Sequence, residues 1–138
     1  MSIEAFTQLF DEVFSKGDLD AADRLVADEI IDHQFAPDGS PGRVVTREQF
    51  KQFVRMLRAG LPDLRYTVED ATREGDKVWM RVRARGTDSG TGQFGHPPTG
   101  RPVSIDVIDV ARFVDGRMVE HWGVPDRLSV LQQVGHHA

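Results

Sequence analysis

The chain has 138 residues, of which 39% are hydrophobic and 28% charged, and it contains no cysteine. At roughly 100–200 residues per domain, this length predicts a single domain over residues 1–138. The lack of cysteine excludes disulfides, thiolate metal sites and a thiol nucleophile. A formal net charge of −5 argues against a nucleic-acid partner, because such binding depends on contacts with phosphates. No apolar run approaches the ~20 residues of a membrane span, and the acidic N-terminal segment is unlike a signal peptide. We therefore expect a cytoplasmic protein that has no membrane partner.

The N-terminal segment is predicted to be helical. Apolar residues recur every three to four positions over Ile3–Phe14, which places them on one stripe of a helix. Gly17 is expected to end this helix. Asp18 or Asp20 is positioned to cap a short second helix that reaches about Val26.

A third helix is predicted after a loop. The segment Glu29–Phe35 is short and ambiguous, and the Pro and Gly residues of 37–42 are typical of a loop. Thr46 and Gln49 have the spacing of a capping box, which starts the helix, and Gly60 and Pro62 end it. Its buried stripe is Phe50, Phe53, Val54, Leu57 and Leu61.

The period then changes to the alternation of strands. Apolar and polar residues alternate around 64–69, 78–85, 105–113 and 117–124, with turn signals at 74–76 and 115–116. A short helix over 128–134 follows, for which Asp126 is a suitable N-cap. Helices and strands are segregated, so the predicted class is α+β, with helices on one face of a mostly antiparallel sheet and a cavity between the layers.

Asp109 interrupts an otherwise apolar strand face. That face reads Ile105, Val107, Asp109, Ala111, Phe113. A carboxylate among apolar side chains is desolvated, which raises its pKa toward the range that a general acid or base needs. The opposite face, which carries Asp106, is also mixed. If that face is the buried one, Asp109 is solvated instead.

Two histidines and a tryptophan are further candidates for the site. In the ambiguous segment 29–35, His33 shares strand parity with Ile31 and Phe35, and His121 lies on the predicted strand over 117–124. Either histidine could orient a substrate or move a proton, or could simply bond to backbone. Trp122 could line a cavity, belong to the core or lie in a dimer interface. A metal site is poorly supported because adjacent Asp32 and His33 point to opposite faces of a strand.

Several segments together resemble the SnoaL-like polyketide cyclases. The stretch Phe94–Arg101 (FGHPPTGR) is similar to the family's G-x-P-P-T-G-R loop, and Arg112–Arg117, Val119–Trp122 and Leu131–Gly135 are similar to its ending. Gly17-Asp18, His33 and Leu61–Leu64 fall where the family has similar residues. The resemblance covers nearly the whole chain.

The resemblance implies a nuclear transport factor 2-like cone of three N-terminal helices on a curved sheet. It also implies a homodimer. Family cyclases close a ring by intramolecular aldol condensation, using an aspartate and neither a metal nor an organic cofactor. That aspartate corresponds to Gly123 here, which cannot move a proton, and the family's pocket histidine corresponds to Asp109.

Three hypotheses follow. The first is a cofactor-independent enzyme that performs aldol-type cyclisation, isomerisation or hydration on a small hydrophobic carbonyl compound. Asp109 is then its general base, His33 and His121 are proton partners or oxyanion donors, and Trp122, Phe53, Leu57 and Val107 bind substrate. The second is a non-catalytic ligand-binding protein in which Gly123 marks a missing catalytic group. The third is a structural or partner-binding domain.

Overall fold

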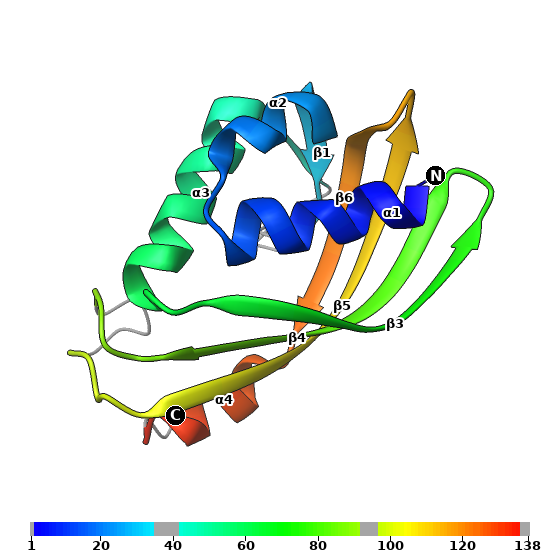
Figure 1. Cartoon of the computed structure of the whole chain (residues 1–138). Coiled ribbons are helices and arrows are strands. Elements are labelled where there is room, and N and C mark those ends of the chain that lie inside the picture. Colours follow the sequence, from blue (N-terminus) through cyan, green and yellow to red (C-terminus); the bar gives the residue numbers. More distant parts are fainter. Residues whose placement is uncertain (1, 35–41, 92–96, 136–138) are drawn as a thin grey trace.

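The computed structural model describes residues 2–34, 42–91 and 97–135. A curved sheet of six strands is covered on one face by helices, as Figure 1 shows. The predicted loop residues 37–41 and the motif residues Phe94–His96 lie outside the described ranges. The predicted α+β class, with helices on a mostly antiparallel sheet, is confirmed.

The N-terminal helix consists of two segments. Helix α1 (Ser2–Gln8) continues into a π-helical segment, η1 (Leu9–Ser15), and the predicted apolar stripe is buried at Phe6, Phe10 and Phe14. Gly17 ends it with a positive φ of 74°, a conformation that glycine adopts without strain. Asp18 accepts a hydrogen bond from Ala21 N and caps the short helix η2 (Leu19–Ala21), which is followed directly by α2 (Ala22–Leu25).

Helix α3 (Arg47–Gly60) has the predicted start. The Thr46 side chain accepts from the Gln49 amide, and the Gln49 side chain accepts from the Thr46 amide, which completes a capping box. Phe50 and Val54 are buried against the core, and Phe53 and Leu57 pack beside it. The apolar stripe of this helix therefore faces the sheet.

Two strands are present before the first strand predicted from the sequence, which begins near residue 64. Strands β1 (Val26–Asp32) and β2 (Arg43–Thr46) lie between α2 and α3, where the sequence pattern was ambiguous. Strand β1 pairs in parallel with β6, nearly 90 positions away along the chain, as in Asp32 opposite His121. Such a partner cannot be recognised from a local pattern of seven residues.

The remaining strands form the antiparallel part of the sheet. They are β3 (Arg65–Glu74), β4 (Lys77–Thr87), β5 (Pro102–Val114) and β6 (Arg117–Pro125), and the sheet order is β2-β1-β6-β5-β4-β3. Asp115 and Gly116 both have positive φ, as a tight hairpin turn requires. Register shifts in the β3–β4 and β5–β6 pairs accompany the curvature. Asp126 caps α4 (Arg127–Gln133), as predicted.

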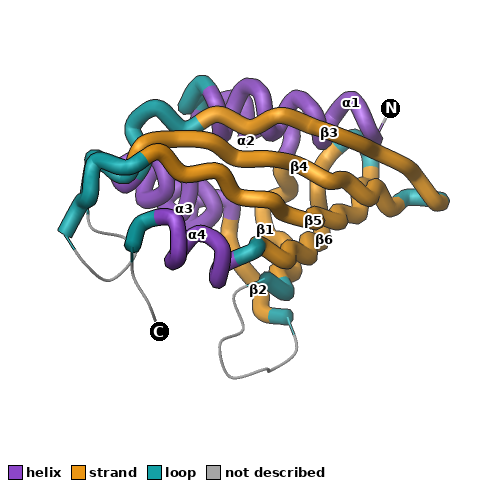
Figure 2. The backbone as a smooth tube through the Cα atoms, turned by 90° about the horizontal axis from the view of Figure 1, so that it is seen from below, coloured by secondary structure: helices purple, strands orange, loops and turns teal. Residues whose placement is uncertain are grey.

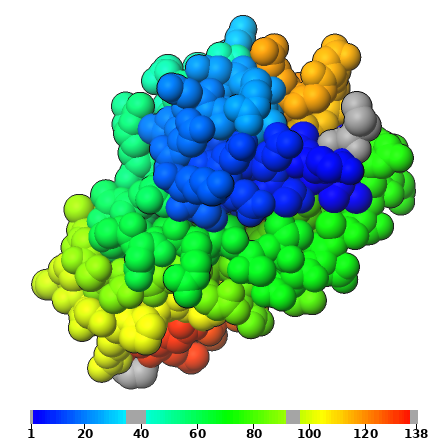
Figure 3. Space-filling model, in the orientation of Figure 1, coloured from blue at the N-terminus to red at the C-terminus, as the bar shows by residue number. Residues whose placement is uncertain are grey.

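The two faces of the sheet have different surroundings. On β4, Val78, Met80 and Val82 are buried under the helices, whereas the alternate residues, Trp79 among them, point to the opposite face. Figure 2 shows the curved strands β3, β4 and β5 running side by side, and Figure 3 shows the N-terminal helices lying closely against β3. None of the described helices is long and apolar enough to cross a membrane.

Candidate functional site

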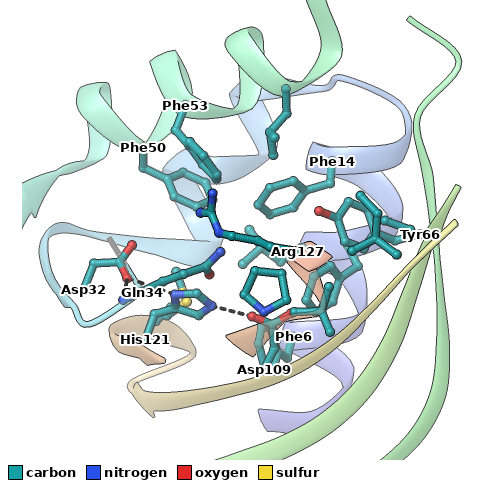
Figure 4. Close-up of a pocket in the computed structure, with 18 of the residues that line it drawn as sticks. Phe6, Phe14, Asp32, Gln34, Phe50, Phe53, Tyr66, Asp109, His121 and Arg127 are labelled. Carbon is teal, nitrogen blue, oxygen red and sulfur yellow. Dashed lines mark hydrogen bonds and ion pairs between the residues drawn. The ribbon is translucent and has the colours of Figure 1, made fainter. Parts of the chain in front are cut away.

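A cavity of about 330 Å³ lies between the helices and the inner face of the sheet. Its walls are mostly aromatic and aliphatic side chains (Figure 4). Helix α4 contributes some of these side chains. Because the walls are apolar, a ligand that enters the cavity would leave water. The polar side chains that reach the cavity are few. The aromatic lining residues are Phe6, Phe10, Phe14, Phe50, Phe53 and Tyr66, and the polar ones are Asp32, Gln34, Asp109, His121 and Arg127.

Asp109 is one of the polar groups in this cavity. It lies on β5 with the buried residues Val107 and Ala111 on its face, and only 4% of its surface is exposed. Asp106 points to the opposite face, where its Oδ1 accepts from Arg83 Nε at 2.8 Å. The face with Asp109 is therefore the covered one, and the alternative in which it is solvated does not apply.

His121 lies between two carboxylates. Its Nε2 is 2.7 Å from Asp109 Oδ1, and its Nδ1 is 3.2 Å from Asp32 Oδ1 (Figure 4). The three side chains come from the adjacent strands β5, β6 and β1. Because both ring nitrogens have an acceptor, the arrangement suits an imidazolium that donates two hydrogen bonds.

The electrostatics favour the charged forms of His121 and Asp32. Burial alone would lower the pKa of His121, but the hydrogen bonds to Asp109 and Asp32 outweigh it and raise the pKa to about 9. Burial would likewise raise the pKa of Asp32, but the hydrogen bond and charge of His121, the Gln34 amide and the charge of Arg43 together outweigh it and lower the pKa below its usual value. At neutral pH the site holds an imidazolium next to the Asp109 carboxyl group.

The raised pKa of His121 predicts a loss of stability at alkaline pH. The folded-state pKa of about 9 exceeds the ordinary value of 6.5, so the stabilisation is complete below pH 6.5 and is lost as the pH rises through 9. We expect the free energy of unfolding to fall by about 3 kcal/mol over this interval, measured by urea denaturation at pH 6 and pH 9.5. In His121→Leu this loss should disappear, and an equal loss in both proteins would contradict the assignment.

The other predicted site residues divide into two groups. Phe53, Leu57 and Val107 line the cavity. His33 and Trp122 are not among its lining residues. Instead the His33 ring stacks on Trp122 with centroids 4.7 Å apart, and its Nε2 is 2.8 Å from Glu120 Oε2. The structure thus brings Asp109 and His121 together but not His33.

Four of the cavity residues with polar side-chain atoms are not predicted from the sequence as site residues, namely Asp32, Gln34, Tyr66 and Arg127. In a strand, Asp32 and Gln34 point to the same face and His33 points to the opposite face. This parity was a usable signal for them. The sequence pattern predicts Tyr66 only as one of the alternating residues of a strand.

The space next to Gly123 is occupied by other side chains. A Cβ built on Gly123 would collide with the side-chain amide of Gln34 and would lie 2.9 Å from Asp109 Oδ1. Gly123 also pairs directly with Asp109 across β5 and β6. Gln34 and Asp109 therefore fill the place that a larger residue would take at position 123.

No group of three or more His, Asp and Glu side chains within the described ranges has an arrangement that could hold a metal ion. The polar groups that line the cavity are carboxylates, an imidazolium, an amide, a phenol and the guanidinium of Arg127.

Comparison with known protein families identifies the family of this chain. The model of the SnoaL-like polyketide cyclases matches residues 4–134. The chain belongs to the SnoaL-like polyketide cyclase family. The family resemblance and the nuclear transport factor 2-like fold predicted from the sequence are therefore confirmed.

Solved structures of SnoaL-like proteins agree with this assignment. The chain is similar to IdmH, a candidate polyketide cyclase from Streptomyces antibioticus, with 34% identity over 98% of this chain and 99% of that one and a TM-score of 0.85. A candidate polyketide cyclase from Acidithiobacillus ferrooxidans shares 30% identity over 97% and 94%, with a TM-score of 0.86. AclR, a candidate hydroxylase from Streptomyces galilaeus, shares 25% identity over 98% of each chain, with a TM-score of 0.74.

Curated protein sequences give no significant match to the chain. Membership of the SnoaL-like family supports a cyclase- or isomerase-type role on a small molecule.

Proposed function

We propose that this SnoaL-like protein is a cofactor-independent acid/base catalyst that removes a proton next to a carbonyl group of a small hydrophobic compound. The observation that carries this proposal is the position of Asp109, a buried carboxylate in an apolar cavity, with one oxygen held by His121. Its second oxygen makes no hydrogen bond to a residue that the structure describes. That oxygen is the proton acceptor.

The proton transfer follows from this arrangement. The ligand C–H bond breaks, the proton goes to Asp109, and the electron pair is delocalised onto the carbonyl oxygen as an enolate. In a ring closure, the enolate carbon then forms a C–C bond to a second carbonyl carbon of the same molecule. The resulting alkoxide takes the proton back from Asp109, so no external oxidant or reductant is needed.

His121 and Asp32 have supporting roles in this reaction. The imidazolium fixes the orientation of the Asp109 carboxyl group through a 2.7 Å hydrogen bond, and Asp32 holds the other side of the ring. The aromatic walls supply apolar surface for a planar ligand and exclude water, and a ligand held folded gains the benefit of proximity.

Deuterium exchange tests this proposal without knowledge of the natural substrate. 2-Acetylnaphthalene is an apolar probe whose methyl protons lie next to a carbonyl. Incubated with the protein in deuterated buffer, it should exchange these protons faster than with buffer alone, as followed by proton NMR. Binding of the probe without any acceleration would favour the second candidate function.

That second candidate is a non-catalytic ligand-binding protein. It is favoured by the filled space at Gly123, the position of the family's catalytic aspartate, where Gln34 places an uncharged amide beside Asp109. The exchange experiment separates the two candidates because both predict binding and only the enzyme predicts acceleration.

We also propose that the protein forms a homodimer through the uncovered face of the sheet. Trp79, Ile108 and Val124 are exposed there, and no described helix covers them. Charged pairs such as Arg83–Asp106 lie beside them and could be matched in a two-fold arrangement. Contiguous apolar surface of this kind is typical of an interface.

Replacing Ile108 tests the dimer. Ile108→Asp puts a carboxylate at the centre of the exposed apolar surface, and desolvating it should weaken dimerisation at least about tenfold. Light scattering after size exclusion should report a dimer for the wild type and a monomer for the variant, with unchanged circular dichroism. A wild-type monomer, or a variant that remains dimeric, would contradict this interface.

A further inference from the structure

Tyr66 presents a phenol to the same cavity as Asp109, from strand β3. Its ring lies between two phenylalanines, with centroids 5.1 Å from Phe10 and 5.2 Å from Phe14. In Figure 4 the hydroxyl of Tyr66 points into the space between the walls, whereas the His121–Asp109 pair lies in another part of the cavity.

The backbone holds this ring in place. The Tyr66 amide donates to Ser15 Oγ at 2.8 Å, which ties strand β3 to the end of η1. Tyr66 also pairs with Ala84 in the β3–β4 ladder. Packing on both sides of the ring and this anchored backbone leave the hydroxyl little freedom, so it is preorganised.

The hydroxyl has no partner among the residues that the structure describes, although the ring is enclosed by apolar groups. The Tyr66 hydroxyl is not among the fully buried polar atoms without a partner, so it is accessible from the cavity and can donate a hydrogen bond to a ligand that enters. Burial raises the pKa of Tyr66 well above its ordinary value, and the negative charge of Asp109 adds to this. The phenol therefore keeps its proton and remains a hydrogen-bond donor.

The strand register gives the separation of the two groups. Tyr66 aligns through Ala84 with Ile105, which is four residues before Asp109 on β5. This corresponds to about 13 Å along the strand and about 10 Å across two strand spacings between the Cα atoms. Because both side chains point into the cavity, their polar ends are closer together, at a distance suited to a ligand of two or more fused rings.

We propose that Tyr66 donates a hydrogen bond to a second oxygen of the ligand, at the end of the molecule away from the carbon that loses its proton. This inference rests on the proposed function and narrows its ligand class. The ligand is a flat apolar body with a reactive carbonyl near Asp109 and a second carbonyl or hydroxyl oxygen near Tyr66. Tyr66 is then a specificity-determining residue.

A pair of matched probes tests this inference. 6-Hydroxy-2-acetylnaphthalene carries oxygens at both ends of a flat apolar body, and 2-acetylnaphthalene lacks the distal one. Dissociation constants are measured for both probes by fluorescence titration, with wild-type protein and with Tyr66→Phe. The wild type should bind the hydroxylated probe about five- to tenfold more tightly, and Tyr66→Phe should reduce this preference to less than twofold.

Controls separate this role from a structural one. Thr67→Val changes the next residue of β3, which is exposed on the opposite face of the sheet, and should keep the full preference. Thermal unfolding of Tyr66→Phe should be unchanged, since phenylalanine keeps the ring packing against Phe10 and Phe14. A preference that survives in Tyr66→Phe, or that is absent in the wild type, overturns the inference.

The outcome is also distinct from that of the proposed function, because the titration measures binding and needs no turnover. A tyrosine-dependent preference without proton exchange would support Tyr66 and overturn the acid/base proposal. Proton exchange with no preference for the hydroxylated probe would support the acid/base proposal and overturn the role of Tyr66. A wild-type protein that binds neither probe would overturn both.

Discussion

Asp109→Asn should slow proton exchange of 2-acetylnaphthalene about 100- to 10,000-fold, because an amide cannot accept the ligand proton. The change is nearly isosteric, and the amide oxygen can still accept the hydrogen bond that His121 Nε2 now gives to Asp109 Oδ1 at 2.7 Å. The cavity should therefore keep its shape, and the dissociation constant of the probe should change much less than the exchange rate. NMR exchange rates and a fluorescence titration measure the two quantities separately.

Asp106→Asn is the matched control for this variant. Asp106 lies on the same strand three residues earlier, but on the opposite face, where it pairs with Arg83. Its replacement should leave the exchange rate within about twofold of the wild type, since surface ion pairs contribute little. Equal exchange rates in Asp109→Asn and wild type would show that another group takes the proton.

His121→Leu is expected to produce the largest loss of stability. The imidazolium lies between Asp109 and Asp32, whose side chains are only 5% and 15% exposed, and leucine would leave both without their partner. Removing one partner from a buried charged group costs about 3–5 kcal/mol. Urea denaturation at pH 6.5 should therefore show a decrease of this order in the free energy of unfolding.

A double variant identifies the cause of that loss. In Asp109→Leu/His121→Leu the orphaned carboxylate is also removed, so the double variant should be more stable than the sum of the two single changes predicts. A His121→Leu protein within about 0.5 kcal/mol of the wild type would mean that the three side chains are not energetically coupled.

The helices and hairpins could be predicted because their signals are local. The capping box at Thr46, the stripe on the N-terminal helix and the turn at Asp115–Gly116 all depend on residues a few positions apart. Strand β1 was missed because its stability comes from pairing with β6, far away in the sequence. No local pattern carries that information.

The site was harder to predict because both faces of the sheet are apolar. Ile31 is 39% exposed and lies on the uncovered face of the sheet. His33 lies on the same face of the strand pattern as Ile31, and because Ile31 is apolar this pattern suggests that His33 points into the core, which is wrong. Trp79 on β4 and Ile108 on β5 are also apolar residues on the uncovered face, so apolar character does not tell the two faces of these strands apart. Asp109 stood out because its own strand face was apolar on both sides, whereas Asp32 was recognised only once β1 lay beside β6.

A crystal structure of the protein with bound 2-acetylnaphthalene tests the central claim most directly. The account predicts the probe in the cavity, with its methyl carbon within about 3.5 Å of the Asp109 carboxylate oxygen that His121 does not bind. A probe found in the cavity with its carbonyl side turned away from Asp109, or found only on the outer face near Trp122, would contradict the assignment of Asp109 as the base.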